Sequence, residues 1–454
     1  MRVLVCGASG CVGRAVAHAL RSRGHQVVDG TRSAADGRHG MHVDYMVPTA
    51  PEEWAAKLRG ARIEAVVNCV GILMPSRGQT FERVHTDGPV ELFRGAAMAG
   101  VHRIVQVSAL GVRGDADTLS TPYLRSKLLA DDALASLPVD WVVLRPSLIY
   151  GPGSQSGALF ATLASLPVIS LPGHGVQPVQ PLHVYELAEC IVRLVERAGA
   201  LHEVHELGGP EALSYRDMLA RYRHALGLGG AVWLPMPLVL MRTMAWLAEL
   251  IPQKVFCRDT IRLLEKGSVP SVNAMPALLG RAPTAMAHGL EISDPEPMLD
   301  LRVNLSPAAE MLARVALAFM WLYTALISAA MPHQSGVLNL LARCGFEGRW
   351  GLAALLFSCT LNAGMGLLSL RRMTPWLGAV QVGAVLGYTI TAALNMPELT
   401  IDHCGPLVKN LPVLALIVLL WLASPLPERS AARPGSRKAR RAGTATLQST
   451  VHAS

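Results

Sequence analysis

The sequence predicts an α/β domain with a doubly wound parallel sheet and a small second lobe, followed by an all-α domain of four transmembrane helices. Two observations lead to this expectation. Apolar runs of strand length alternate with helical patterns over residues 1–200, and four long apolar segments almost free of charge follow residue 300. We therefore expect domains over residues 1–300 and 301–427, and a disordered basic tail over residues 428–454.

The first part of the chain contains five short runs of the buried-strand type. Helical patterns fill the stretches between these runs, and such an alternation predicts βαβ units and a parallel sheet. The expected strands are Val3–Cys6, His25–Val28, Ala65–Asn68, Arg103–Ser108 and Trp141–Arg145.

Charge and composition argue against nucleic-acid binding. The 454 residues have a formal net charge of +8, but only 16% of them are charged and 51% are hydrophobic. Residues 1–300 contain 28 basic and 28 acidic side chains, so this part offers no basic excess to phosphates. The positive excess lies in the apolar region and the tail, where it serves as a topology signal.

The apolar region predicts four membrane crossings. A helix needs about 20 apolar residues to span the hydrocarbon core. Two segments meet this length, while the first needs Arg314 at the interface and the short fourth needs Lys409 there. The alternative, a soluble helix bundle, has too few charges to form a polar face. The segments are Val315–Met331, Trp350–Leu370, Met373–Met396 and Leu411–Leu426.

Basic residues predict the orientation in the membrane. Arg371 and Arg372 lie between the second and third segments, and the basic tail follows the fourth. The chain starts directly with a strand pattern and no secretory segment. We therefore expect a multi-pass protein of the cell (inner) membrane, with the first domain and the tail in the cytoplasm. Residues 231–251 we expect to form an amphipathic helix, either in the domain core or on the bilayer surface.

A glycine-rich phrase after the first strand predicts a dinucleotide site of the Rossmann type. Gly7 permits a tight turn, Gly10 lets the backbone approach a pyrophosphate, and Gly13 lets helix and strand pack closely. The following helix presents free N–H groups to the phosphates. The residues expected to contact the cofactor here are Gly7, Ser9, Gly10, Cys11, Val12 and Gly13.

The end of the second strand favours NADP over NAD as the cofactor. An NAD site usually has an acidic residue there, but Thr31 occupies that place. Arg32 follows and can meet a 2′-phosphate, while Asp29 lies two residues too early.

Tyr123 and Lys127 indicate acid–base chemistry. Their spacing places both side chains on one face of a helix. A nearby ammonium favours tyrosinate, so the phenol would exchange a proton near neutral pH. Ser108 ends a strand and could orient a substrate carbonyl. These three residues form the expected catalytic set.

On these motifs the sequence resembles the extended and atypical short-chain dehydrogenases/reductases over residues 1 to about 300. Within that family it is similar to the NAD-dependent epimerase/dehydratase-like group and to the branch with the accessory subunit of respiratory complex I. The resemblance implies that Lys127 holds the ribose and that His183 and Val184 come from the substrate lobe. It adds five expected cofactor contacts: Asp44 at the adenine, Pro146 beside the nicotinamide, and Tyr45, Asn68 and Gly71.

Two positions depart from that family's pattern. His85 stands where an asparagine is frequent, and Tyr185-Glu186 stands where two aspartates are frequent. These departures affect the expected substrate class more than cofactor binding.

Residues 305–425 resemble the DoxX-like membrane family, on the phrase HCGPLVKNLPVLAL at 403–416. The polar residues His333, Asp402 and His403 have no metal-ligand spacing, so no metal site is expected. Cys344 and Cys404 fall in the two outer loops and could pair if these loops face the periplasm.

These features predict a membrane-anchored NAD(P)-dependent oxidoreductase acting on a carbonyl, hydroxyl or quinone-like substrate of apolar character. Two alternatives stay open: a dinucleotide-binding structural or assembly factor of a membrane complex, and an epimerase or dehydratase. The expected partners are a small-molecule substrate, the lipid bilayer and an unidentified membrane complex, with no nucleic acid.

Overall fold

The computed structural model describes most of the chain, in two compact units that are treated separately below. The expected domain boundary at residue 300 lies outside the described residues. The described ranges are 1–33, 39–75, 78–112, 121–166, 168–248, 258–293, 307–332, 337–371, 373–396 and 408–423.

Within the described residues, the first unit is built on a seven-stranded sheet in which all neighbouring strands are parallel. The strand order is β11-β6-β5-β4-β1-β2-β3. All five expected strands are present, and β3 and β11 extend the sheet at its two edges. The strands are β1 (Arg2–Cys6), β2 (Gln26–Thr31), β3 (Gly40–His42), β4 (Ala65–Asn68), β5 (Arg103–Val107), β6 (Asp140–Pro146) and β11 (His202–Leu207).

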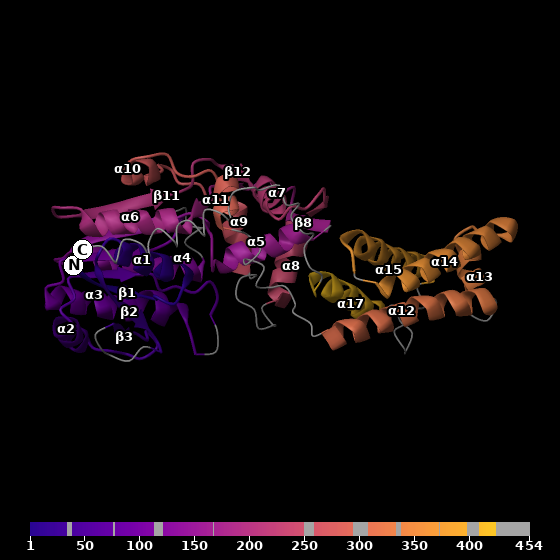
Figure 1. Cartoon of the computed structure of the whole chain (residues 1–454), viewed down its shortest axis with the longest axis horizontal. Coiled ribbons are helices and arrows are strands. Elements are labelled where there is room, and N and C mark those ends of the chain that lie inside the picture. Colours follow the sequence, from indigo (N-terminus) through magenta and orange to yellow (C-terminus); the bar gives the residue numbers. More distant parts are fainter. Residues whose placement is uncertain are drawn as a thin grey trace, which may run out of the picture. The chain divides into compact units, whose positions relative to one another are not determined.

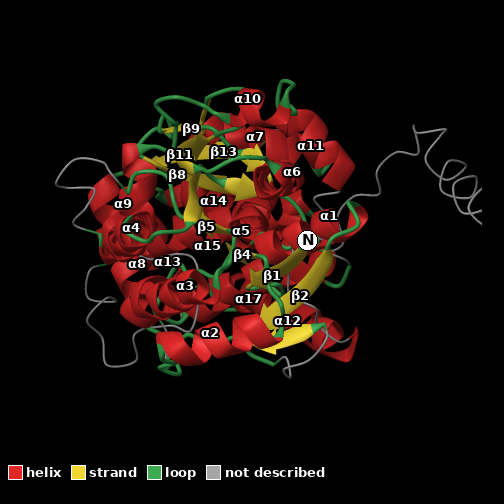
Figure 2. Cartoon of the chain, turned by 90° about the vertical axis from the view of Figure 1, so that its left-hand side faces the viewer, coloured by secondary structure: helices red, strands yellow, loops and turns green. Residues whose placement is uncertain are grey.

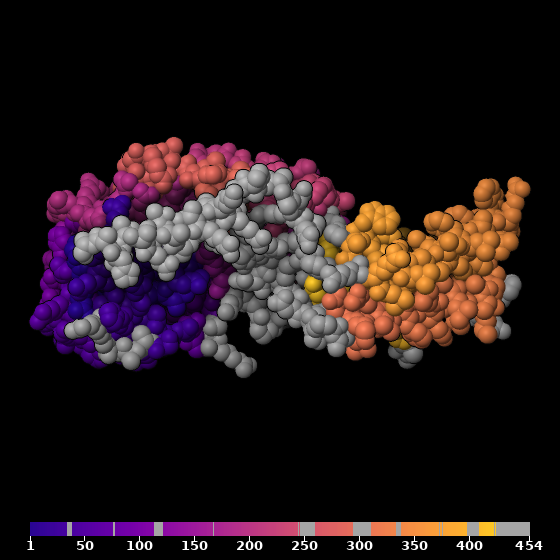
Figure 3. Space-filling model, in the orientation of Figure 1, coloured from indigo at the N-terminus to yellow at the C-terminus, as the bar shows by residue number. Residues whose placement is uncertain are grey.

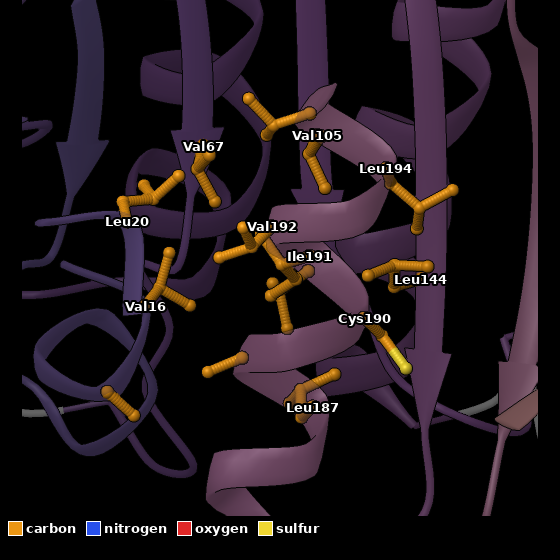
Figure 4. Packing of buried hydrophobic residues seen from close by; sticks show 14 of the residues in the cluster. Val16, Leu20, Val67, Val105, Leu144, Leu187, Cys190, Ile191, Val192 and Leu194 are labelled. Atoms are coloured by element: carbon orange, nitrogen blue, oxygen red, sulfur yellow. The ribbon is translucent and has the colours of Figure 1, made fainter. Parts of the chain in front are cut away.

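Helices cover both faces of this sheet (Figures 1 and 2). Successive residues of a strand point to opposite faces, so Val3 and Val5 join one core while Leu4 and Cys6 join the other. Figure 4 shows the first core, which α1 and α6 close. Helices α2 and α3 close the second. The flanking helices are α1 (Cys11–Ser22), α2 (Pro51–Gly60), η1 (Glu82–Asp87), α3 (Gly88–Ala99), α4 (Pro122–Ala135) and α6 (Val184–Glu196).

A buried arginine fastens the C-terminal end of α6 to the sheet. Arg103 on β5 is fully buried, and its guanidinium donates to the carbonyls of Leu194, Arg197 and Gly199 at 2.6–2.8 Å. The carboxylate of Asp140 lies 3.3 Å away. These contacts satisfy carbonyls in the last turn of α6 and just beyond its end, which have no partner inside the helix.

The later part of the unit forms a smaller lobe, whose residues run from magenta to salmon in Figure 3. Its described elements are β7 (Ile149–Tyr150), α5 (Gln155–Ser165), β8 (Val168–Pro172), β9 (Pro178–Val179), β10 (Leu182–His183), β12 (Leu213–Ser214), α7 (Tyr215–Ala225), β13 (Val232–Met236), α8 (Leu238–Ala248), α9 (Arg258–Lys266), α10 (Met275–Leu279) and α11 (Met286–Ser293).

One element of this lobe differs from its prediction. The expected helix over residues 231–251 begins as strand β13, which pairs in parallel with β8, and becomes helical only at Leu238. Pro235 and Pro237 explain the change, because proline removes the N–H that a helix interior needs.

Within the described residues, three helices are long and apolar enough to cross a membrane: α12 (Pro307–Ala330), α14 (Gly348–Ser369) and α15 (Pro375–Asn395). The fourth expected segment forms a shorter apolar helix, α17 (Asn410–Ala423), and the short helix α13 (Val337–Arg343) precedes α14. The 14 residues of α17 rise about 21 Å, less than the roughly 30 Å of the hydrocarbon core. His333, Asp402, His403, Cys404 and the tail lie outside the described residues.

Candidate active site

The site lies where the strand order reverses. Strand β1 sits between β2 and β4, and its neighbours lead to loops on the same edge of the sheet. In open α/β sheets, ligands bind outside the carboxyl ends of the strands at such a point.

The turn after β1 has the geometry of a dinucleotide-binding loop. Gly7 has a φ of +76°, and its N–H donates to the carbonyl of Gly30 at 2.8 Å. A side chain at Gly13 would place its Cβ 2.1 Å from the Gly7 carbonyl oxygen, so only glycine fits. At Gly10 the nearest protein atom to such a Cβ is 3.3 Å away. The chain itself therefore requires Gly13, whereas Gly10 leaves room for a bound group.

The N-terminus of α1 also suits a phosphate. Ser9 and Gly10 are exposed, and among the described residues no side chain caps the helix. Its first turn contains no acidic residue. Free N–H groups and the positive end of the helix dipole favour an anion there. Cys11 and Val12 are half-buried, and the Cys11 thiol donates to the Pro152 carbonyl at 3.4 Å.

The end of β2 offers a cation and no available carboxylate among the described residues. Arg32 is exposed, and Thr31 is half-buried. Asp29 instead pairs with Arg21 of α1 at 2.7 Å. Asp44 is half-buried, and its carboxylate accepts from the Met46 N–H at 3.0 Å.

Two residues expected at the cofactor are turned into the protein. The Tyr45 hydroxyl donates to Asn68 Oδ1 at 2.9 Å, and Asn68 Nδ2 donates to Gln106 Oε1 at 2.8 Å. Tyr45 is 4% exposed and Asn68 is 0% exposed. Their side chains therefore support the loop after β4, in which the Val70 N–H also donates to Asn68 Oδ1. A direct contact of either side chain with a cofactor does not fit this placement.

Lys127 lies beneath that loop. Its ammonium donates to the carbonyls of Val70 at 3.2 Å and Val107 at 3.1 Å. A Cβ at Gly71 would be 3.2 Å from the Lys127 Nζ, so glycine keeps this approach open. Burial lowers the pKa of Lys127 to about 8, although the negative charge of Asp131 acts to raise it. An ammonium has three N–H donors, so one is left for a ribose hydroxyl.

Tyr123 stands on the first turn of α4 against two other rings. His85 and Phe81 meet it edge-on, with ring centroids 5.5 and 5.9 Å from that of Tyr123. Burial raises the pKa of Tyr123 to about 12. This differs from the expected ionisation near neutral pH, because loss of hydration outweighs any help from the ammonium one turn away.

His85 is a neutral, fully partnered histidine. Its Nε2 accepts from the Ile72 N–H at 3.0 Å, and its Nδ1 lies 3.0 Å from the Ser126 hydroxyl. An acceptor at Nε2 places the proton on Nδ1, and the Ser126 hydroxyl then donates to the Tyr123 carbonyl at 2.8 Å. Burial lowers the pKa of His85 to about 2. The residue thus links the loop after β4 to the helix that holds Tyr123.

Ser108 is held by a buried ion pair that sequence reasoning missed. Its hydroxyl donates to the Asp131 carboxylate at 2.8 Å, and Arg145 lies 3.2 Å from the same oxygen. Burial raises the pKa of Asp131, although the hydrogen bond from Ser108 and the positive charge of Arg145 act to lower it. The spacing of Lys127 and Asp131, one helical turn, was the available signal. Ser108 can accept a hydrogen bond here, but its proton is committed to Asp131.

The remaining expected residues lie at the border with the smaller lobe. Pro146 ends β6 and is buried, and its carbonyl accepts from the Leu110 N–H at 3.1 Å. His183 precedes α6, where its Nδ1 accepts from the Tyr185 N–H and its Nε2 contacts the Ser293 hydroxyl. Burial lowers the pKa of His183. Val184 packs against Gly151, which has a φ of +130°.

Family models match both parts of the chain. Residues 3–208 match the NAD dependent epimerase/dehydratase family, and residues 318–418 match the DoxX-like family. The chain therefore joins an epimerase/dehydratase-type dinucleotide-binding domain, of the short-chain dehydrogenase class, to a DoxX-like membrane domain.

Curated relatives align with the first domain. One is the mouse mitochondrial NADH dehydrogenase [ubiquinone] 1 alpha subcomplex subunit 9, 26% identical over 54% of this chain and 66% of that protein. Another is a 3-diazoavenalumate denitrifying reductase of Streptomyces, 29% identical over 54% of this chain and 88% of that protein. The alignment thus spans just under two thirds of the mouse subunit.

Solved structures support the same fold. MoeE5 in complex with UDP-glucose and NAD has a TM-score of 0.50 and 20% identity, and covers 65% of this chain and 98% of its own. A Bacillus cereus UDP-glucuronic acid 4-epimerase in complex with NAD has a TM-score of 0.50 and 17% identity, and covers 66% and 99%. Both proteins hold NAD.

Proposed function

We propose that this protein is a membrane-anchored NAD(P)-dependent oxidoreductase for a carbonyl, hydroxyl or quinone-like substrate of apolar character. The observation that supports it best is the buried Lys127 ammonium. It lies beside Gly71, at the carboxyl ends of the central strands, and one helical turn from Tyr123. Such a cluster matches the donor set that holds a ribose and moves a proton. The uncapped α1 helix and the Gly13 contact fit the pyrophosphate of the cofactor.

The chain's own residues would divide the work as follows. A nicotinamide cofactor supplies or accepts the hydride. Tyr123, whose raised pKa keeps it protonated at neutral pH, donates its phenolic proton to the substrate oxygen. The Lys127 ammonium holds the ribose and stabilises the tyrosinate that forms. Ser108, fixed by Asp131, accepts a hydrogen bond from a substrate hydroxyl.

NADP is the cofactor that the end of β2 favours. Arg32 is exposed there, and the only described carboxylate of that strand, Asp29, is already paired with Arg21. A 2′-phosphate would gain a guanidinium at this position and meet no competing carboxylate among the described residues.

We propose that the protein lies in the inner membrane of the cell, with the first domain and the tail in the cytoplasm. This orientation requires α17 to act as a fourth crossing. Lys409 lies just before that helix, where its long side chain would reach the headgroups. Fusion of a reporter active on only one side of the membrane, placed after residue 454, tests it.

A second candidate is a dinucleotide-binding assembly factor without turnover, which the similarity to the mouse respiratory-complex subunit favours. A third, favoured by the family model, is an epimerase or dehydratase. The epimerase would use the same Tyr123 and Lys127 but would consume no cofactor overall.

Cofactor oxidation across a panel of apolar ketones and quinones separates the three. We expect wild-type protein in lipid discs to oxidise NADPH, and Tyr123→Phe to lose at least about 100-fold in rate while still binding NADPH. Tyr323→Phe, on α12, is the matched control and should keep the wild-type rate. Equal rates for Tyr123→Phe and wild type would refute the oxidoreductase, and product without net NADPH loss would indicate the epimerase.

A further inference from the structure

The smaller lobe has an apolar surface that none of the described residues covers. Four large aliphatic side chains within nine residues of sequence are at least 48% exposed, two on β13 and two on the first turn of α8. We call this surface the lobe face, and its residues are Val232, Leu234, Val239 and Leu240.

The packing of α8 explains why this face stays uncovered. Met241 and Ala245, one turn apart, point inward and pack with Ile261 of α9, and Met236 of β13 joins them. The opposite side of the helix, with Val239, must then face outward. Val232 and Leu234 share the side of β13 that Met236 occupies, because side chains of a strand alternate. They are nevertheless exposed, because the cluster of Met241, Ala245 and Ile261 contacts Met236 and leaves the first part of that side open.

The surroundings of the lobe face suit a lipid headgroup layer. The Arg216 guanidinium lies over the Trp233 ring at 5.2 Å from its centroid, on the side of β13 opposite Val232 and Leu234. Arg242 is half-exposed on α8 beside its partner Glu265. Arginines next to exposed aliphatic side chains are typical of amphipathic helices that lie in a membrane interface.

The chain also brings a bilayer within reach of this lobe. Helix α11 ends at Ser293 and packs against α7 of the same lobe, while the membrane-type helix α12 begins at Pro307. Fourteen residue steps of extended chain span at most about 50 Å. A surface tethered this closely meets lipid at a high effective concentration.

We propose that the lobe face rests on the bilayer that contains the chain's own membrane helices, with Val239 and Leu240 inserted at the headgroup–acyl boundary. The occupant is the lipid itself. This contact does not depend on the reaction proposed above, and it would hold equally for a protein without turnover.

Hydrogen exchange measured by mass spectrometry on the full chain tests the contact. The protein is placed in lipid discs of two parts phosphatidylcholine to one part phosphatidylglycerol, or in a lipid-free amphiphilic polymer. We expect residues 232–243 to exchange at least threefold more slowly in lipid than in polymer. The double variant Val239→Ser, Leu240→Ser should lose this difference. Met98→Ser with Val204→Ser, which changes two other exposed apolar residues, should keep it.

A photo-crosslinking amino acid at position 240 identifies the occupant. Adducts with lipid are the expected result. Adducts with a second copy of the chain, or equal exchange of residues 232–243 in lipid and in polymer, would overturn the proposal. The melting temperature of each variant in the polymer shows that a lost difference does not come from unfolding.

Discussion

The contact at Gly13 makes a prediction that separates folding from cofactor binding. Its Cβ, if added, would lie 2.1 Å from the Gly7 oxygen and 2.6 Å from the Gly7 carbon, both backbone atoms. Helix α1 would have to withdraw by more than an ångström to restore an ordinary contact. Overpacking of this kind costs about 3 kcal/mol, so we expect Gly13→Ala to lower the Tm by about 5–10 °C and to weaken NADPH binding.

Gly10→Ala is the matched variant, because the nearest protein atom to its Cβ is 3.3 Å away. Its backbone conformation suits any residue. We expect a stability change of at most about 1 kcal/mol, but at least a tenfold loss of NADPH affinity, since the methyl group would occupy the pyrophosphate position. Thermal unfolding and NADPH fluorescence titration measure both quantities. Wild-type Tm in Gly13→Ala, or wild-type affinity in Gly10→Ala, would refute this reasoning.

Three further predictions concern buried charges. The pKa of His85 is about 2 in the folded chain and near 6.5 in the unfolded chain, so the unfolded chain gains the proton first as pH falls. The free energy of unfolding of wild type should therefore fall by about 2 kcal/mol between pH 7 and pH 5, whereas His85→Gln should not show this loss. Parallel curves of stability against pH for the two proteins would contradict this. NADPH affinity should fall as pH rises through about 8, where Lys127 loses its charge, and this dependence should be absent in Lys127→Met. Arg103→Met leaves several buried carbonyls without donors and should cost about 3–5 kcal/mol by thermal unfolding; a cost under 1 kcal/mol would count against the fastening role.

Much of the sheet could be predicted from the sequence, and its edges could not. The five expected strands are the interior strands of the sheet, so most of their side chains are buried and their sequences are largely apolar. Strand β11 reads HEVHEL and lies at an edge, where polar side chains meet solvent. Strand β3 has only three residues, too few for any period to show.

The candidate site was predictable where glycine or spacing dictates geometry, and less so elsewhere. Gly13 and Lys127 lie where their motifs place them. Tyr45 and Asn68 turn inward because they satisfy each other, and such pairing between a turn and a distant strand leaves no signal in a single sequence. Asp131 escaped notice because its role depends on Arg145, which reaches it from a neighbouring strand.

The position of β11 also bears on how the protein is made. The sheet is complete only when residues 202–207 have added to β6, and α12 begins at residue 307, one hundred residues later. At about 5–20 residues per second, this leaves about 5–20 s of synthesis between the last strand and the first membrane helix. Parallel sheets with many distant pairings fold slowly. The order of the elements thus gives the nucleotide-binding domain time to form its sheet before the membrane helices reach the insertion machinery.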